Sequence, residues 1–131
     1  MLQNRGAFFM QKHISNINLK VLNKLCKGNE TRKLNYLKQF LEMIPLSVQK
    51  IKFAIDKGDR KTILKELHYM SPQLVFFGID DYYVVMENIR KGENILFNEL
   101  KKQIDIGIVR IENAIIEVEE LVIYQSNNSK I

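Results

Sequence analysis

Residues 61–78 read KTILKELHYMSPQLVFFG, and this stretch decides how the chain folds. Its apolar residues recur at steps of four and three, which places them on one face of an α-helix. These residues are Ile63, Leu67, Met70, Leu74 and Phe77. His68 follows Leu67 directly, about 100° further round the helix. We therefore expect a helix that buries the apolar line and holds one imidazole at the edge of its buried face.

The ends of this helix are marked by residues with known preferences. Asp59 suits the N-cap position, and Gly78 is a natural C-terminal stop. Pro72 lies inside the helix, where it cannot donate a hydrogen bond to the carbonyl of His68 four residues back. We expect the helix to bend or loosen immediately after the histidine.

The preceding segment has the strongest helical periodicity in the chain. Asn29 or Thr31 could cap its start, and Gly58 would end it. Pro45 lies in its middle, so either one kinked helix or two separate helices is expected. The apolar positions of this segment are Leu34, Leu37, Leu41, Ile44, Val48, Ile51 and Ile55.

Three further helices follow from the same reasoning. A short one is expected from Ile17 to about Lys27, and another from Asp80 and Asp81, which suit a first turn, to about Arg90. A long helix is expected at about residues 98–124, and its apolar stripe is Ile104, Ile108, Ile111, Ile115, Val118 and Val122.

No segment alternates with the period of two that marks a strand. The fold expected is all-α, an antiparallel four-helix bundle with an extra short N-terminal helix. Residues 1–16 show no clean period and would form a leader, mobile or loosely packed, before a bundle at residues 17–124. Residues 125–131 would be a polar tail.

Composition limits the classes of protein that this chain can represent. A length of 131 residues predicts one domain, and the single cysteine, Cys26, excludes an internal disulfide. With only two histidines besides, a metal site is not expected. No apolar run could span a bilayer, and the N-terminus is too polar for a signal peptide, so a cytoplasmic protein without membrane association is expected.

The net charge of +5 is unevenly distributed. Residues 1–68 carry 14 Lys and Arg against 5 Asp and Glu, a balance of +9, whereas residues 69–131 carry 6 against 10, a balance of −4. A basic half can bind nucleic acid, an acidic protein or a phosphoryl group. Because the lysines are scattered and no nucleic-acid-binding motif is present, nucleic acid is not an expected partner.

The usual catalytic motifs are missing, which leaves His68 as the candidate reactive group. There is no glycine-rich phosphate loop and no Gly-x-Ser-x-Gly, and Asp80-Asp81 is typical of a helix start rather than a metal pair. Lys61 and Lys65 lie on the same side of the helix as His68. They favour a neutral, nucleophilic ring and could stabilise a phosphoryl group on it, although a structural histidine beside a solvated helix face has the same pattern.

The chain resembles the histidine-containing phosphotransfer domains of multistep two-component phosphorelays. The resemblance covers about residues 17–124 and centres on AIDKGDRKTILKELHYMSPQLVFFGI, followed by VMENI. The family has Gly-Asp about nine residues before its histidine, Leu or Met two after, Gly ten after, and Leu/Met-Glu on the next helix. The matching residues are Gly58-Asp59, His68, Met70, Gly78 and Met86-Glu87.

The resemblance implies that His68 accepts a phosphoryl group from the aspartate of one receiver domain and passes it to another. It implies a monomer without kinase or hydrolase activity of its own and without a cofactor, because the receiver binds the Mg²⁺. The partners implied are response-regulator receiver domains and a hybrid sensor histidine kinase.

The chain departs from the family at two positions. Ser71 and Pro72 stand where the family commonly has Lys and Gly. Lys65 and Lys61 could replace the missing charge, and Ser71 or Gln73 could donate a hydrogen bond to the phosphoryl group. The receiver would dock on Met70, Pro72, Phe76 and Gly78. The alternative is an adaptor of the same fold that binds a kinase or receiver without phosphotransfer.

Overall fold

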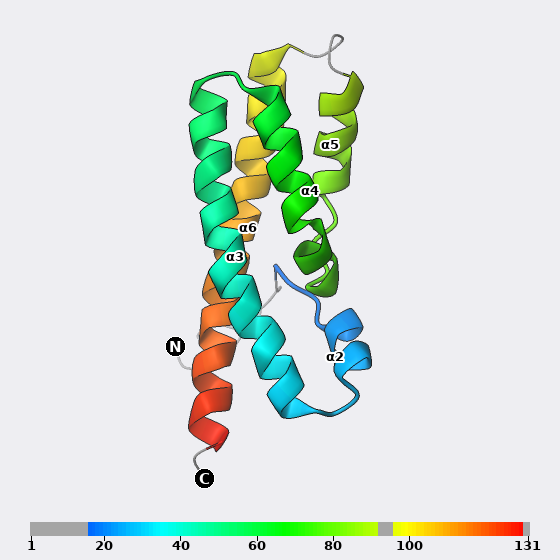
Figure 1. Ribbon diagram of the computed structural model, residues 1–131, viewed down its shortest axis with the longest axis vertical. Helices are drawn as coiled ribbons and strands as arrows, with labels where there is room; N and C mark the ends of the chain where they lie inside the picture. The colour runs from blue at the N-terminus through cyan, green and yellow to red at the C-terminus, as the bar shows by residue number, and fades with distance from the viewer. Residues whose placement is uncertain (1–15, 92–95, 130–131) are drawn as a thin grey trace, which may run out of the picture.

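The computed structural model describes residues 16–91 and 96–129, and it is all-helical in these residues. The prediction of an all-α fold is confirmed, and the arrangement is compatible with a four-helix bundle plus a short N-terminal helix. Successive long helices run up and down side by side, and α2 packs at one end against α3 and α4 (Figure 1). Residues 1–15 of the expected leader lie outside the described residues. The helices are α2 (Lys20–Cys26), α3 (Glu30–Asp56), α4 (Arg60–Phe76), α5 (Tyr82–Lys91) and α6 (Phe97–Ser129).

Helix α3 passes through Pro45 without a break, so the two-helix alternative is wrong. Asn29 caps its start by accepting a hydrogen bond of 3.0 Å from the backbone amide of Arg32. Ile44 and Val48 are buried on either side of the proline. Burial of the apolar face on both sides stabilises the helix enough to offset the hydrogen bond that proline removes.

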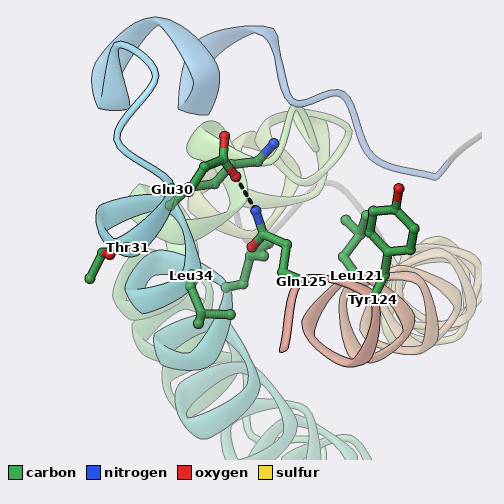
Figure 2. A pocket seen from close by; sticks show the side chains of 8 residues that line it. Glu30, Thr31, Leu34, Leu121, Tyr124 and Gln125 are labelled. Atoms are coloured by element: carbon green, nitrogen blue, oxygen red, sulfur yellow. Dashed lines mark hydrogen bonds between the residues drawn. The ribbon is translucent and has the colours of Figure 1, made fainter. Parts of the chain in front are cut away.

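Helix α6 is longer than expected and reaches Ser129, so the polar tail begins as helix. The helix continues because its last turns lie beside the start of α3. There Gln125 donates a hydrogen bond to Glu30, at the wall of a cavity of 490 Å³ (Figure 2). The cavity is lined by Glu30, Thr31, Lys33, Leu34, Leu37, Leu121, Tyr124 and Gln125.

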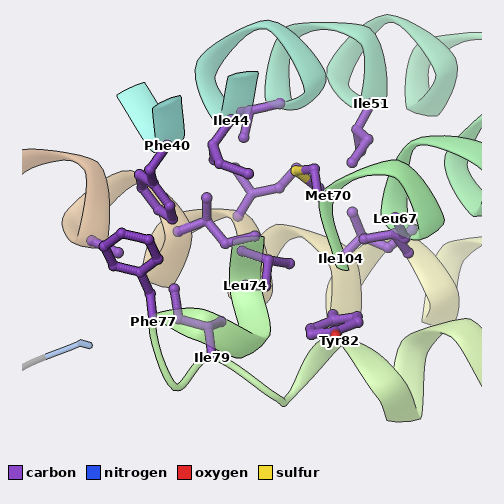
Figure 3. Close-up of a cluster of buried hydrophobic side chains, with 14 of the residues drawn as sticks. Phe40, Ile44, Ile51, Leu67, Met70, Leu74, Phe77, Ile79, Tyr82 and Ile104 are labelled. Atoms are coloured by element: carbon purple, nitrogen blue, oxygen red, sulfur yellow. The ribbon is translucent and has the colours of Figure 1, made fainter. Parts of the chain in front are cut away.

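The core is built from the apolar lines that the sequence predicts on α3, α4 and α6 (Figure 3). Phe77 lies against Phe40 of α3, with ring centroids 4.4 Å apart. All five members of the α4 line are buried, as are Ile104, Ile108, Ile111 and Val118 of α6. This packing fixes the rotation of α4 about its own axis, because turning it would expose the whole line.

Arg110 of α6 joins three segments that are distant in the sequence. Its guanidinium binds the carboxylate of Asp81 and donates to the carbonyls of Asn16 and Gly78, at 3.3 and 3.5 Å. The hydrogen bond from Arg110 lowers the pKa of the Asp81 carboxyl. We expected Asp81 inside the first turn of α5, and it lies directly before the helix, which starts at Tyr82.

Gly78 gives the first test of this packing. Its φ is +72°, and a Cβ there would lie 2.6 Å from the Cβ of Asn18, whereas Gly58, with φ +65°, has open space around it. We expect Gly58→Ala to lower the free energy of unfolding by about 1 kcal/mol through backbone strain alone. Gly78→Ala should cost at least about 2 kcal/mol more, because of overpacking.

Urea unfolding followed by circular dichroism measures both losses. Equal losses for the two variants would mean that the segment around Asn18 moves aside, contrary to the packing described.

Candidate functional site

His68 lies on the solvent-exposed side of α4. Leu67 and Met70 on either side of it are 5% and 0% exposed, and their burial turns the imidazole outward. The sequence predicted a ring at the edge of the buried face, and the structure places it among the exposed residues of α4. A partner protein can therefore reach it without any change in the packing of α4.

The imidazole contacts an arginine from the next helix. Nη2 of Arg90 in α5 lies 3.1 Å from Nε2 of His68, and Nη1 of Arg90 binds Oε1 of Glu87 at 3.1 Å. Because a guanidinium can only donate hydrogen bonds, Nε2 must be the acceptor. The neutral ring in this arrangement therefore carries its proton on Nδ1.

Sequence reasoning missed Arg90. Met86 and Glu87 match the family pattern, but that pattern gives no role to Arg90, which follows Glu87 by three residues. A Glu and an Arg three apart on a helix are neighbours, which predicts their ion pair. The contact with His68 needs the loop between α4 and α5 and the rotation of both helices, so it is visible only in the structure.

The two lysines proposed for the phosphate environment are exposed on the same ridge as His68. Lys65 lies about 4.5 Å from His68 along the helix axis and Lys61 about 10.5 Å. Neither forms an ion pair with any described residue, so both charges face solvent. Lys65 is about one helical turn from His68, while Lys61 is about two turns away.

Ser71 and Pro72 form a compensating pair around the backbone of His68. Pro72 has no amide hydrogen for the carbonyl of His68, and the hydroxyl of Ser71 donates to that carbonyl instead, at 2.8 Å. The hydroxyl of Tyr82 from α5 donates to the carbonyl of Ser71 at 3.3 Å. Helix α4 continues through this turn, so the expected loosening after the histidine does not occur.

Four of the predicted site residues lie elsewhere than expected. Gln73 is buried, and its amide contacts Met43 of α3, so it does not face the imidazole. Met70 is also buried, so it cannot form a docking surface, and Gly78 is half-buried with Asn18 packed against it. The hydroxyl of Ser71 is committed to the helix backbone rather than to a phosphoryl group. These corrections share one cause, because each position faces α3, the N-terminal segment or the helix itself.

The surface that remains around His68 is small and mixed. Pro72 is exposed, and Phe76 is half-buried with its ring edge-on to Tyr36, centroids 5.4 Å apart. Two exposed residues that the sequence did not single out, Tyr69 and Val75, flank the histidine ridge on α4. A docking protein would meet these apolar side chains together with the lysines and Arg90.

Neither a metal centre nor a membrane span is found in the described part of the chain. No group of three His, Cys, Asp or Glu side chains is placed to hold an ion within residues 16–91 and 96–129. No described helix combines the length and apolar character needed to cross a bilayer.

Comparisons with protein-family models, with curated proteins and with solved structures found no match to this chain. The resemblance to phosphotransfer domains therefore rests on the residues around His68.

The compensation by Ser71 can be measured in a double-mutant cycle with Pro72. We expect Ser71→Ala to cost about 0.5–1 kcal/mol, because the carbonyl of His68 loses its donor. In a Pro72→Ala background the amide of residue 72 supplies that hydrogen bond, so the same change should cost little. We expect a coupling free energy of about 0.5 kcal/mol or more between the two substitutions, measured from the free energies of unfolding in urea. Additive effects would show that the hydroxyl contributes nothing to the turn.

Proposed function

We propose that this protein is a phosphorelay intermediary that accepts a phosphoryl group on His68 from a receiver-domain aspartate and passes it to another receiver. The observation that carries the proposal is an exposed imidazole, fixed on a packed helix, whose Nε2 lies 3.1 Å from the guanidinium of Arg90. A nucleophilic nitrogen next to a cation suits transfer of a dianionic group.

The reaction is an in-line displacement at phosphorus. The lone pair of Nε2 forms the N–P bond while the P–O bond to the receiver aspartate breaks. The aspartate carboxylate leaves with the bonding electrons, and the proton of the neutral ring stays on Nδ1. The reverse sequence returns the phosphoryl group to a second receiver. The receiver would carry the Mg²⁺ that neutralises charge on the transferred group.

Arg90 takes the role that the family gives to a lysine three residues after its histidine, a position held here by Ser71. In the unphosphorylated protein the guanidinium donates to Nε2, so it must move aside before that nitrogen attacks. A short shift from Nε2 to the phosphoryl oxygens keeps a charge-assisted hydrogen bond in both states. Glu87 holds the guanidinium beside the ring, and Lys65 adds a second positive charge to the same side.

The wider proposal follows from this site. The fold would be the antiparallel four-helix bundle with an extra N-terminal helix, and the protein would act in the cytoplasm. Its partners would be receiver domains and a hybrid sensor histidine kinase. It would not phosphorylate or hydrolyse anything on its own.

One observation favours a second candidate, an adaptor that docks a kinase or receiver without transfer. The lone pair of Nε2 is engaged by Arg90, which Glu87 in turn holds in place. If this arrangement persisted when the receiver docks, the nitrogen could not attack phosphorus. The two candidates share a docking surface and differ only in whether Arg90 leaves the ring.

Incubation with a phosphorylated receiver domain separates the candidates. Label that is labile in acid and stable in base should appear on the wild type, and His68→Gln should stay unlabelled. Arg90→Ala should slow the transfer by about tenfold or more, because a charged donor to the phosphoryl oxygens is lost. Arg32→Ala is the matched control, since Arg32 is an exposed arginine at the start of α3, and it should transfer at the wild-type rate.

A stoichiometric complex with the receiver that never yields label would contradict phosphotransfer and support the adaptor. An unchanged or faster rate in Arg90→Ala would remove the arginine from the phosphoryl site, even if His68 is labelled.

A further inference from the structure

The outer face of α6 carries a second row of apolar residues, opposite the row that packs in the core. Its members are more than half exposed, whereas the inner row, which includes Leu100, Ile104 and Val118, is buried. The outer row recurs at steps of four and three, as in a coiled-coil seam. We call it the outer seam, and its residues are Lys102, Ile106, Val109, Asn113, Ile116, Glu120 and Ile123. The apolar members are Ile106 (74% exposed), Val109 (57%), Ile116 (53%) and Ile123 (61%).

The flanks of α6 are occupied by its neighbours, which leaves this seam facing away from the molecule. On one flank Glu112 binds Lys52 of α3 at 2.8 Å. On the other, Gln103 accepts a hydrogen bond of 2.7 Å from Asn88 of α5. Within the described part of the chain no helix covers the face between these two contacts. An exposed apolar seam of this length marks an interaction surface.

The charges on the seam are complementary to those of a second, antiparallel copy of the chain. Lys102 lies near one end and Glu120 near the other, about 27 Å apart along the axis. Two copies of α6 running antiparallel place each Lys102 opposite the Glu120 of the other copy. A parallel pair would instead place lysine against lysine and glutamate against glutamate, which is unfavourable.

The same antiparallel register pairs part of the apolar row. With Lys102 opposite Glu120, Ile106 faces Ile116 of the second copy, whereas Val109 faces Asn113 and Ile123 faces Glu99. Because the arrangement is two-fold symmetric, each of these pairings occurs twice. Lys102 has an intrahelical partner in Glu99 at 3.6 Å, but that pair is exposed and weak and can be exchanged for the contact between copies.

We propose that the protein forms an antiparallel homodimer through the outer seam of α6. A single helix from each copy buries less than the roughly 800 Å² per partner typical of stable complexes, so a dissociation constant in the micromolar range is expected. The resemblance to phosphotransfer domains implied a monomer, and the sequence analysis considered only the inner apolar stripe of α6.

The dimer does not depend on the proposed phosphotransfer. Helices α3 and α5 each pack between α4 and α6, so α4 lies diagonally across from the seam. His68 therefore stays accessible in both copies, on opposite outer sides of the dimer. The seam variants below should leave phosphotransfer unchanged.

Sedimentation velocity over about 5–500 µM protein tests the dimer, with a mass expected to rise from one chain toward two. Ile116→Asp should raise the dissociation constant at least about tenfold, because it buries a charge at the seam. Phe53→Asp is the matched control, since Phe53 is an apolar residue on the outer face of α3 with an exposed fraction of 67%. It should dimerise as the wild type does, and circular dichroism would confirm that both variants fold.

A charge swap tests the register. Lys102→Glu and Glu120→Lys should each weaken the dimer at least about tenfold, and the two changes combined should return the dissociation constant to within about threefold of the wild type. A protein that remains a monomer at 500 µM, or a dimer weakened equally by Phe53→Asp, would overturn the proposal. Failure of the combined variant to recover would also overturn it, because the antiparallel pairing would then be absent.

Discussion

The burial of one face of α4 is the constraint on which the rest of the structure depends. Helix α4 packs between α3 and α5, and its apolar line leaves it no freedom to rotate. His68 must then face solvent, and the turn of Ser71 and Pro72 must lie just beyond it on the same helix. The site is therefore set by hydrophobic packing on the opposite side of the helix, and no strained or buried polar arrangement is needed to hold the imidazole.

Much of this fold could be predicted from the sequence, because helical periodicity records which face is buried. The lines on α3, α4 and α6 lie in the core as the spacing indicates. The errors occur where a local preference competes with a distant contact. Asp81 lies at the start of α5, as its chemistry indicates, but its contact with Arg110 of α6 was not expected. Pro45 weakens a helix locally, but apolar burial on both sides keeps α3 continuous.

The candidate site was less predictable for a related reason. The sequence identifies His68 as an unusual polar residue beside an apolar line, and it gives the order of the residues around it. It does not give the distance between α4 and α5, so Arg90 was missed. Gln73 and Met70 were placed near the imidazole because they are close in sequence. They point toward α3, as residues five and two positions from an exposed residue on a helix can do.

The three contacts of Arg110 have a consequence for how the protein opens. One guanidinium holds the start of α5, the end of the turn after α4 and the chain that leads into α2. When any one of these segments detaches, the other two lose part of their anchoring at the same moment. The entrance to α2 and the segment carrying Arg90 therefore belong to one cooperative unit, although they are more than sixty residues apart in the chain.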